Sequence, residues 1–279
     1  MQLRYNRFIH SEFMTHKVFS RNASSSRAIP VKKMIDDLRR DPAMPVFWGS
    51  NKPGMQAGDE LLGHDLSLAK EIWLRGMNLA IRQAEALIEV GLHKQIANRI
   101  LEPWAHINVV VTATQYKNFF ALRSHPDAQP EIKVLSDLMQ AEMAHSLPSV
   151  INEGQWHLPY VLASDWITIR EYAKSGRITR DEPQYEELVK LGIKVSCARC
   201  ARVSYLTHDG RETSVEEDIE LHDKLLSSVP LHASPAEHQA TPDVKMDSEF
   251  GMWLNPHLHG NLVGWKQYRK LLPDEFIMG

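Results

Sequence analysis

The chain has 279 residues, of which 43% are hydrophobic and 24% charged, and its formal net charge is −3 at neutral pH. This apolar content can form a sizeable core, while the charge gives no general attraction to nucleic acid or to an anionic membrane. Two cysteines exclude a disulfide framework, and no apolar run reaches the roughly 18 residues that a membrane helix needs. Together with a polar N-terminus that lacks a signal peptide's apolar stretch, these features predict a soluble cytoplasmic protein.

The first third of the chain predicts one long helix between less regular segments. Residues 3–14 mix apolar and polar residues as a strand or short helix would. Residues 42–64 are rich in Pro, Gly, Asn and Met, which indicates a long ordered loop or an insertion. In the helix that follows, Asp65 is a candidate N-terminal cap and Gly91 a candidate C-terminal cap. Helical spacing places four apolar residues roughly on one side of it: Leu68, Ile72, Leu79 and Ala86.

The middle of the chain predicts three helices around one strand. A helix over 93–101 should stop at Pro103, because proline cannot continue a helical ladder. The run INVVVTAT, residues 107–114, is the best strand candidate, since consecutive valines favour the extended backbone. Two further helices are expected over residues 115–123 and 130–145.

The C-terminal part predicts two helices. Thr213 and Glu216 match a capping box at the start of one helix, and residues 261–272 are expected to form the last helix. The sequence shows no internal repeat. Helices mixed with isolated strands indicate an α+β fold, with a mixed or antiparallel sheet and a large helical part.

The stretch THKVFSRNASSSRAIP, residues 15–30, gathers hydroxyl groups and cations in sixteen positions. Serine hydroxyls, backbone N–H groups and an arginine fork together satisfy phosphate oxygens. The alternative is a solvated serine-rich loop, for which the composition is equally typical. Apolar residues border the stretch closely on both sides, which argues against a flexible tail.

Two arginines stand in otherwise apolar helical stretches: Arg99 in ANRILEP and Arg123 in FALRSHPDAQPEI. A buried guanidinium is costly unless it meets an anion or a polar ligand. An internal ion pair, or a side chain that reaches out to water, explains most arginines of this kind. A ligand role is the second reading.

Cysteines and histidines offer weaker signals. The CARC motif could form a redox site or half of a zinc site, although Cys197 and Cys200 are more simply buried small residues. A metal site is one reading of the C-terminal histidines, but no known ligand spacing accompanies them, and we expect no bound metal: His232, His238, His257 and His259. The residues by themselves predict an α+β protein that binds a phosphorylated ligand.

The segment THKVFSRNASSSRAIP resembles the signature of flavin-dependent thymidylate synthases, in which seven residues separate a His-containing basic triplet from a serine, with an arginine two positions later. Here the pair His16 and Lys17 is followed by Val18 to Ser24, then by Ser25 and Arg27. Three letters depart from the usual pattern of that family: Thr15, Lys17 and Ala28.

Further blocks are similar to the same family. ANRILEP resembles its Ala-Arg-x-x-Leu-Pro segment, and KNFFALRSHPDAQPEI resembles its helix that ends in Leu-Arg. CARVSY (200–205) and SPAEH (234–238) are similar to blocks that precede the signature in the family, so their order here is permuted. The resemblance, of the phage or bacterial type, implies a single domain over residues 1–279 with the family's fold and with insertions near 32–92 and 140–190.

That resemblance implies the methylation of dUMP to dTMP, with methylenetetrahydrofolate as carbon donor, NADPH as reductant and FAD as redox carrier. Arg123 would polarise the uracil, assisted by Arg99. The implied substrate-binding residues also include Glu12, Ser24, Ser25, Ser26 and Arg27, and the implied cofactor-binding residues are His16, Lys17, Ser20, Asn22, Asn118 and His238.

The family builds its sites between subunits of a homotetramer, and neither nucleic acid nor a membrane is an expected partner. Two alternatives stay open. One is a related flavin-dependent hydroxymethylase or methylase that acts on dUMP or dCMP. The other is a non-catalytic protein that binds nucleotides or RNA through the Ser/Arg segment.

Overall fold

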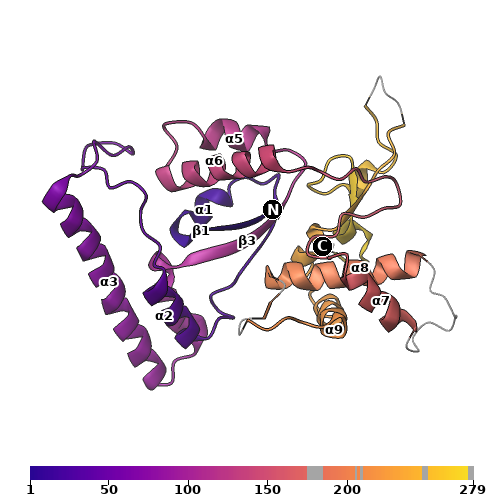
Figure 1. Cartoon of the computed structure of the whole chain (residues 1–279), viewed down its shortest axis with the longest axis horizontal. Helices are drawn as coiled ribbons and strands as arrows, with labels where there is room; N and C mark the ends of the chain where they lie inside the picture. Colours follow the sequence, from indigo (N-terminus) through magenta and orange to yellow (C-terminus); the bar gives the residue numbers. More distant parts are fainter. Residues whose placement is uncertain (175–184, 205, 208–209, 247–250, 276–279) are drawn as a thin grey trace.

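The structure is a computed structural model of the chain and describes residues 1–174, 185–204, 206–207, 210–246 and 251–275. Figure 1 shows the N-terminal strands and helices on one side and the helices α7, α8 and α9 on the other. The described elements combine helices with small antiparallel sheets, which confirms the predicted α+β class. The sheets are smaller than the helical part.

A three-stranded antiparallel sheet organises the N-terminal half. Its order is β1 (Gln2–Asn6), β3 (His106–Thr112) and β2 (Ser20–Ala23), so β3 pairs on both sides. The valines Val109 and Val111 of β3 are fully buried. The valine run therefore forms the central strand, as predicted, with bounds shifted by one or two residues.

One face of this sheet carries the largest apolar cluster. The cluster includes Phe13 of α1 (His10–Phe13), Phe119 of α5 (Lys117–Arg123) and Ile132 of α6 (Pro130–His145). The short 3-10 helix η1 (Arg7–Ile9) leads from β1 into α1. The helix predicted over 130–145 has these bounds in the structure, because Gln129 caps its first turn and proline is favoured there.

Three other helices of the N-terminal half contribute to a second apolar cluster: α2 (Val31–Arg40), α3 (Gly63–Glu89) and the 3-10 helix η2 (Asn98–Trp104). The short helix α4 (Lys94–Ala97) leads into η2. Helix α2 was not predicted. The predicted stop at Pro103 was wrong, because the tighter 3-10 turn continues past it to Trp104.

Helix α3 begins near its predicted start, but Asp65 is not its cap. Leu62 occupies the N-cap position without a side-chain hydrogen bond. At the other end Gly91 has a φ of +87°, the left-handed conformation that glycine adopts freely at helix ends. The predicted C-terminal cap is therefore confirmed.

The C-terminal half contains three packed helices: α7 (Asp165–Lys174), α8 (Tyr185–Arg202) and α9 (Val215–Leu226). The capping box of α9 uses Ser214 and Glu217, so the predicted pair was off by one residue. Cys197 and Cys200 are buried within α8 without a disulfide, as the simpler reading of CARC expected.

The predicted last helix was wrong. Residues 261–272 contain instead the strand β5 (Trp265–Gln267) and the 3-10 helix η5 (Tyr268–Leu271). Strand β5 pairs with β4 (Ala240–Pro242), which follows the 3-10 helix η3 (Ser234–Glu237). His257 lies in the 3-10 helix η4 (Pro256–Leu258), and His259 follows it directly. Tertiary pairing outweighed helical spacing in this region.

Across the described residues, every helix is too short or too polar to span a bilayer.

Candidate functional site

The Ser/Arg segment of residues 15–30 runs from the end of α1 through β2 to the start of α2. The four extended residues of β2 span roughly 13 Å along the strand, a distance that most side chains cannot bridge. The segment therefore has two separate ends. We call residues 15–17 the imidazole end and residues 24–27 the serine end.

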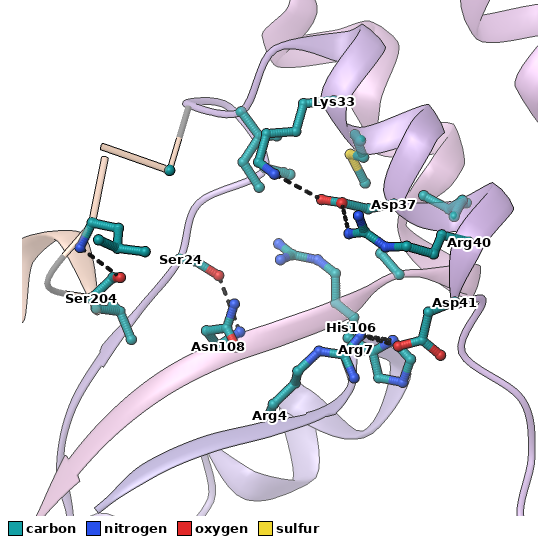
Figure 2. A pocket seen from close by; sticks show the side chains of 18 of the residues that line it. Arg4, Arg7, Ser24, Lys33, Asp37, Arg40, Asp41, His106, Asn108 and Ser204 are labelled. Carbon is teal, nitrogen blue, oxygen red and sulfur yellow. Dashed lines mark hydrogen bonds and ion pairs between the residues drawn. The ribbon is translucent and has the colours of Figure 1, made fainter. Parts of the chain in front are cut away.

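A cavity of about 630 Å³ opens at the serine end (Figure 2). Its walls come from β1, β3 and α2, and from the end of α8 with the residues that follow it. Five cationic side chains and two carboxylates line it: Arg4, Arg7, Lys33, Arg40 and Arg202 against Asp37 and Asp41. The excess positive charge suits an anionic ligand.

Ser24 is fixed at the cavity by reciprocal bonds with Asn108 of β3. The Ser24 N–H donates to the Asn108 carbonyl over 2.8 Å, and the Asn108 N–H donates to the Ser24 Oγ over 3.1 Å. Figure 2 shows both residues on the cavity wall. The first serine of the serine end is thus held as an extension of the sheet.

A single carboxylate oxygen organises the next serine. Glu102 Oε1 accepts hydrogen bonds from Ser26 Oγ over 2.6 Å and from Arg99 Nη1 over 3.0 Å. The same oxygen lies 3.0 Å from Arg7 Nη2 in an ion pair. The buried Asn98 also donates to the Ser26 carbonyl over 2.7 Å. Two predicted residues, Ser26 and Arg99, are therefore brought together, with Glu102 as their shared partner.

The remaining charges of the cavity are partly paired. Arg4 Nη2 lies 2.5 Å from Asp41 Oδ2 and 3.0 Å from His106 Nδ1. The hydrogen bond from Arg4 lowers the pKa of Asp41, so this carboxylate stays ionised. Asp37 pairs with Arg40 over 2.5 Å and with Lys33 over 3.5 Å, both at the surface. Such exposed pairs are weak and can yield their cation to a stronger anion.

The imidazole end forms a different cluster, built on α1 and α5. Arg123 Nε donates to His16 Nε2 over 2.9 Å, and its Nη1 lies 3.9 Å from Glu12 Oε2. Burial first, and then the charges of Arg123 and Arg21, lower the pKa of His16. His16 is therefore a neutral imidazole that accepts a hydrogen bond from Arg123. Its ring packs edge-on against Phe119, with 4.8 Å between the two ring centroids. The structure brings together three predicted residues here, apart from the cavity.

Four predicted residues are exposed and make no side-chain hydrogen bond or ion pair within the described part of the chain: Lys17, Ser25, Arg27 and Asn118. Ser25 and Arg27 belong to the serine end. Lys17 belongs to the imidazole end. Asn118 is next in sequence to Phe119, whose ring packs against His16 of that end. These side chains are available to another molecule.

The other three predicted cofactor residues bond to the C-terminal half or to the central strand. Gln267 Nε2 donates to Ser20 Oγ over 3.0 Å, and Asn22 Nδ2 donates to the Cys200 carbonyl over 2.7 Å. His238 Nδ1 lies 3.0 Å from Thr112 Oγ1. Burial lowers the pKa of His238 to about 3, with smaller effects from the N-terminal ammonium and His157. The C-terminal half therefore covers part of β2.

The blocks CARVSY and SPAEH meet the Ser/Arg segment in space although they lie far from it in sequence. Asn22 bonds to the carbonyl of Cys200, and its Oδ1 accepts from Ser234 Oγ over 3.2 Å. Arg202 and Ser204 line the cavity. The last residue of CARVSY, Tyr205, lies outside the described residues.

Charged groups in the C-terminal half mostly bond to one another. Arg199 bonds to Asp165 over 2.6 Å and to the buried Asp218 over 2.8 Å. Asp243 lies 2.9 Å from His259 Nε2, whose Nδ1 accepts from the Gly264 N–H. Within the described ranges, no group of three or more His, Cys, Asp or Glu side chains could hold a metal ion. These networks stabilise the fold.

Sequence reasoning missed Arg4, Arg7, Glu102 and Arg202. Glu102 stands inside the ANRILEP block, so its position next to Arg99 was an available signal. Arg4 and Arg7 come from the N-terminal segment, which contains no recognisable motif. The pairing of β1 with β3 brings Arg4 to the cavity, and the Arg7 N–H continues that pairing with a hydrogen bond to the Ala105 carbonyl.

The family described as Thy1, "Thymidylate synthase complementing protein", matches residues 1–149 of this chain. The matched range contains the Ser/Arg segment, β1 to β3 and the helices α1 to α6. No curated protein matches the sequence.

Two solved structures of the UMP/dUMP methylase PolB from Streptomyces cacaoi are similar to the chain. The complex with 5-Br UMP has 20% identity and a TM-score of 0.42, and the alignment covers 51% of this chain and 67% of that one. The complex with 5-Br dUMP has 19% identity and a TM-score of 0.41, with coverage of 51% and 65%.

Proposed function

Because the chain belongs to the family of thymidylate synthase complementing proteins, we propose that it methylates dUMP to dTMP with methylenetetrahydrofolate, FAD and NADPH. The observation that carries this proposal is the cationic cavity at the serine end of the family's signature segment. A nucleotide monophosphate needs such a cluster of charged and hydroxyl donors.

The serine end would hold the phosphate. Ser24 and Ser26 line the cavity wall. The exposed Ser25 and Arg27 lie next to them in the chain and have no side-chain partner among the described residues. Arg7 adds a charge from the cavity wall, held in place by Glu102. Hydrogen bonds to charged groups contribute about 1.5–3 kcal/mol each, so a few of them suffice for micromolar binding.

The imidazole end would hold and polarise the base. As the uracil ring gains nucleophilic character at carbon, negative charge spreads onto its carbonyl oxygens, and a permanently charged donor stabilises that charge. Arg123 is our choice for this donor, oriented by the neutral His16 and by Glu12. Arg99 would assist from the phosphate side through Glu102.

The two ends lie apart within one chain, and Arg123 is not among the described residues that line the cavity. We therefore propose a composite site in a homotetramer, in which the imidazole end of one subunit meets the serine end of another. The exposed donors at both ends, without partners in the described part of their own chain, support this arrangement.

The predicted flavin residues divide into two groups. His16, Lys17 and Asn118 fit the polar edge of FAD, because His16 packs against Phe119 and the other two are the chain neighbours of this pair. Lys17 and Asn118 also have donors without a partner among the described residues. Ser20, Asn22 and His238 fit less well, since each bonds to another part of the chain. When bound, FAD would supply the redox chemistry that the side chains lack.

The permuted order of the blocks is part of the proposal. Contacts of Asn22 with Cys200 and Ser234 support the reading that CARVSY and SPAEH occupy the places they would have in an unpermuted chain. On this reading residues 1–279 act as one domain, with insertions near 32–92 and 140–190. Residues 175–184 of the second insertion lie outside the described residues.

Mixing two inactive variants tests the composite site. Arg123→Ala should abolish turnover through the imidazole end, and the pair Ser25→Ala and Arg27→Ala should prevent nucleotide binding at the serine end. After dissociation and reassembly, mixed tetramers should regain up to roughly a quarter of the sites, because some sites then combine two intact ends. Mixtures that stay inactive while forming mixed tetramers would contradict a site shared between subunits.

The reaction itself is tested with purified protein and FAD. We expect flavin absorption in the bound fraction, tritium release from 5-labelled dUMP and dTMP as the product by mass spectrometry. A hydroxymethylated product, or release from dCMP alone, would assign the alternative enzyme. Nucleotide binding without flavin and without tritium release would instead indicate a non-catalytic nucleotide- or RNA-binding protein.

A further inference from the structure

The end of α8 reaches the cavity from the C-terminal half of the chain. Arg202, the last residue of α8, and Ser204 both line the cavity wall. Figure 2 shows Ser204 on one side of the cavity and Arg40 and Asp41 on the other. Arg202 and Ser204 lie outside residues 1–149, the range that matches the Thy1 family, so the match gives them no role.

A buried carboxylate holds Arg202 in place. Its Nη1 donates a hydrogen bond to Asp218, whose side chain is fully buried. The same carboxylate accepts hydrogen bonds from Arg199 Nε over 2.8 Å and from Thr213 Oγ1 over 2.9 Å. Arg202 is therefore oriented before any ligand arrives, which lowers the entropic cost of binding.

The Arg202 guanidinium keeps donors for a ligand. Its side chain is only 19% exposed, and its Nε and Nη2 have no hydrogen-bond partner among the described residues. A guanidinium has five N–H donors, and polar groups with so little access to water are normally paired. Arg7 is in the same state, 16% exposed and held from behind by Glu102. Two anchored arginines, one from each half of the chain, therefore line one cavity.

The backbone between Arg202 and Ser204 is strained. Val203 has a φ of +55°, a left-handed conformation that is unusual for a β-branched residue. Its side chain is buried against Val110 of β3 and Cys200 of α8, and this packing keeps the conformation in place. Strain that packing enforces occurs preferentially at functional sites. Here the turn at Val203 ends α8 and brings Ser204 to the cavity wall.

Ser204 adds a hydroxyl donor beside this arginine. Its Oγ accepts a hydrogen bond from the Leu206 N–H over 2.9 Å, which leaves the hydroxyl hydrogen to donate. An arginine fork next to a hydroxyl suits a phosphate oxygen or another anionic group. We propose that Arg202 is a further ligand-binding residue of the cavity, with Ser204 as its second donor, so that one phosphorylated nucleotide is held by both halves of the chain.

This inference rests on the proposed function only for the identity of the ligand, dUMP. Isothermal titration of the purified full-length protein with dUMP, with no folate or NADPH present, measures binding without turnover. Arg202→Met should weaken binding by about tenfold or more, because charge-assisted hydrogen bonds are lost. Lys194→Met is the matched control on the same helix, since Lys194 pairs with Asp223 away from the cavity, and it should leave the affinity unchanged.

Two further variants separate binding from folding. Arg202→Lys keeps a cation next to Asp218 and should still weaken binding several-fold, because lysine lacks the fork of donors. Ser204→Ala leaves the bonds of Asp218 intact and should also weaken binding several-fold. Circular dichroism and urea unfolding verify that each variant is folded, and these two variants decide the question if Arg202→Met is not.

Hydrogen exchange tests whether the ligand contacts both halves. Bound dUMP should slow amide exchange in residues 2–9 and in residues 199–204 of the wild type. Arg202→Met, at a saturating dUMP concentration, should lose the second protection and keep the first. Protection of residues 2–9 alone in the wild type would overturn the proposal.

The titrations can also contradict it. The proposal fails if Arg202→Lys and Ser204→Ala bind dUMP as the wild type does, if Lys194→Met weakens binding as much as Arg202→Met, or if the wild type binds no dUMP. Weaker binding in the Arg202 and Ser204 variants of an enzyme without turnover would support it and contradict the proposed reaction. Turnover with an unchanged KM in these variants would do the reverse, so the two failures are distinguishable.

Discussion

The two halves of the molecule treat their polar residues differently. In residues 1–149, four side chains of the predicted site are exposed and make no side-chain bond in the described part of the chain: Lys17, Ser25, Arg27 and Asn118. In residues 150–275, the described charged groups that are buried, such as Arg199 and Asp243, bond to other side chains. The difference agrees with the site proposed for residues 1–149, and internal bonding in the described C-terminal half serves stability.

The largest expected effect is the loss of a buried charge partner in the C-terminal half. Arg199 is 5% exposed and bonds to Asp165 and Asp218. Arg199→Met should lower the free energy of unfolding by about 3 kcal/mol or more, because it leaves buried carboxylates without that cation. Urea unfolding measures this. Arg211→Met, at an exposed pair with Glu217, should change stability little.

A change in the N-terminal half should instead affect activity and preserve the fold. Arg123→Ala should lower kcat by roughly 10²-fold or more, because a donor to developing charge is lost. Its urea midpoint should stay close to the wild type. His125→Ala, an exposed neighbour, is the control. Turnover equal to the wild type in the Arg123 variant would remove the proposed role of the imidazole end.

A buried histidine in the C-terminal half should make stability depend on pH. The pKa of His238 is lowered by burial to about 3, whereas an unfolded histidine titrates near 6.5. Between these values the unfolded chain binds more protons, so the stabilisation is complete above pH 6.5 and decreases as the pH falls towards 3, by up to about 1.4 kcal/mol per pH unit. His238→Gln should flatten this dependence of the unfolding free energy, and His125→Gln should not.

The smallest effect should come from the cavity wall. Arg7→Ala should weaken dUMP binding by about tenfold, because one charge-assisted bond is lost, with KM raised and kcat nearly unchanged. Isothermal titration at two salt concentrations measures the affinity and its weaker salt dependence. Arg39→Ala is the control, since Arg39 of α2 pairs with Glu85 away from the cavity. Equal losses in both variants would indicate a general effect of charge rather than a site.

Much of the local structure followed from the sequence. The consecutive valines of β3 and the apolar spacing with Pro130 in α6 are signals that lie within the element itself. Where an element depends on contacts with a distant part of the chain, the prediction of secondary structure failed. Residues 261–272 have helical spacing, yet the pairing of β5 with β4 makes three of them a strand.

The sequence alone determined the residue types and the internal order of the Ser/Arg segment, because spacing along a chain is a local property. Tertiary structure decided that Glu102 joins Arg7, Arg99 and Ser26, and that β2 separates the imidazole end from the serine end. It also decided that Leu68, Ile72 and Leu79 of α3 face solvent. Each of these depends on partners distant in sequence, and a side chain's environment is set by whatever the whole fold packs against it.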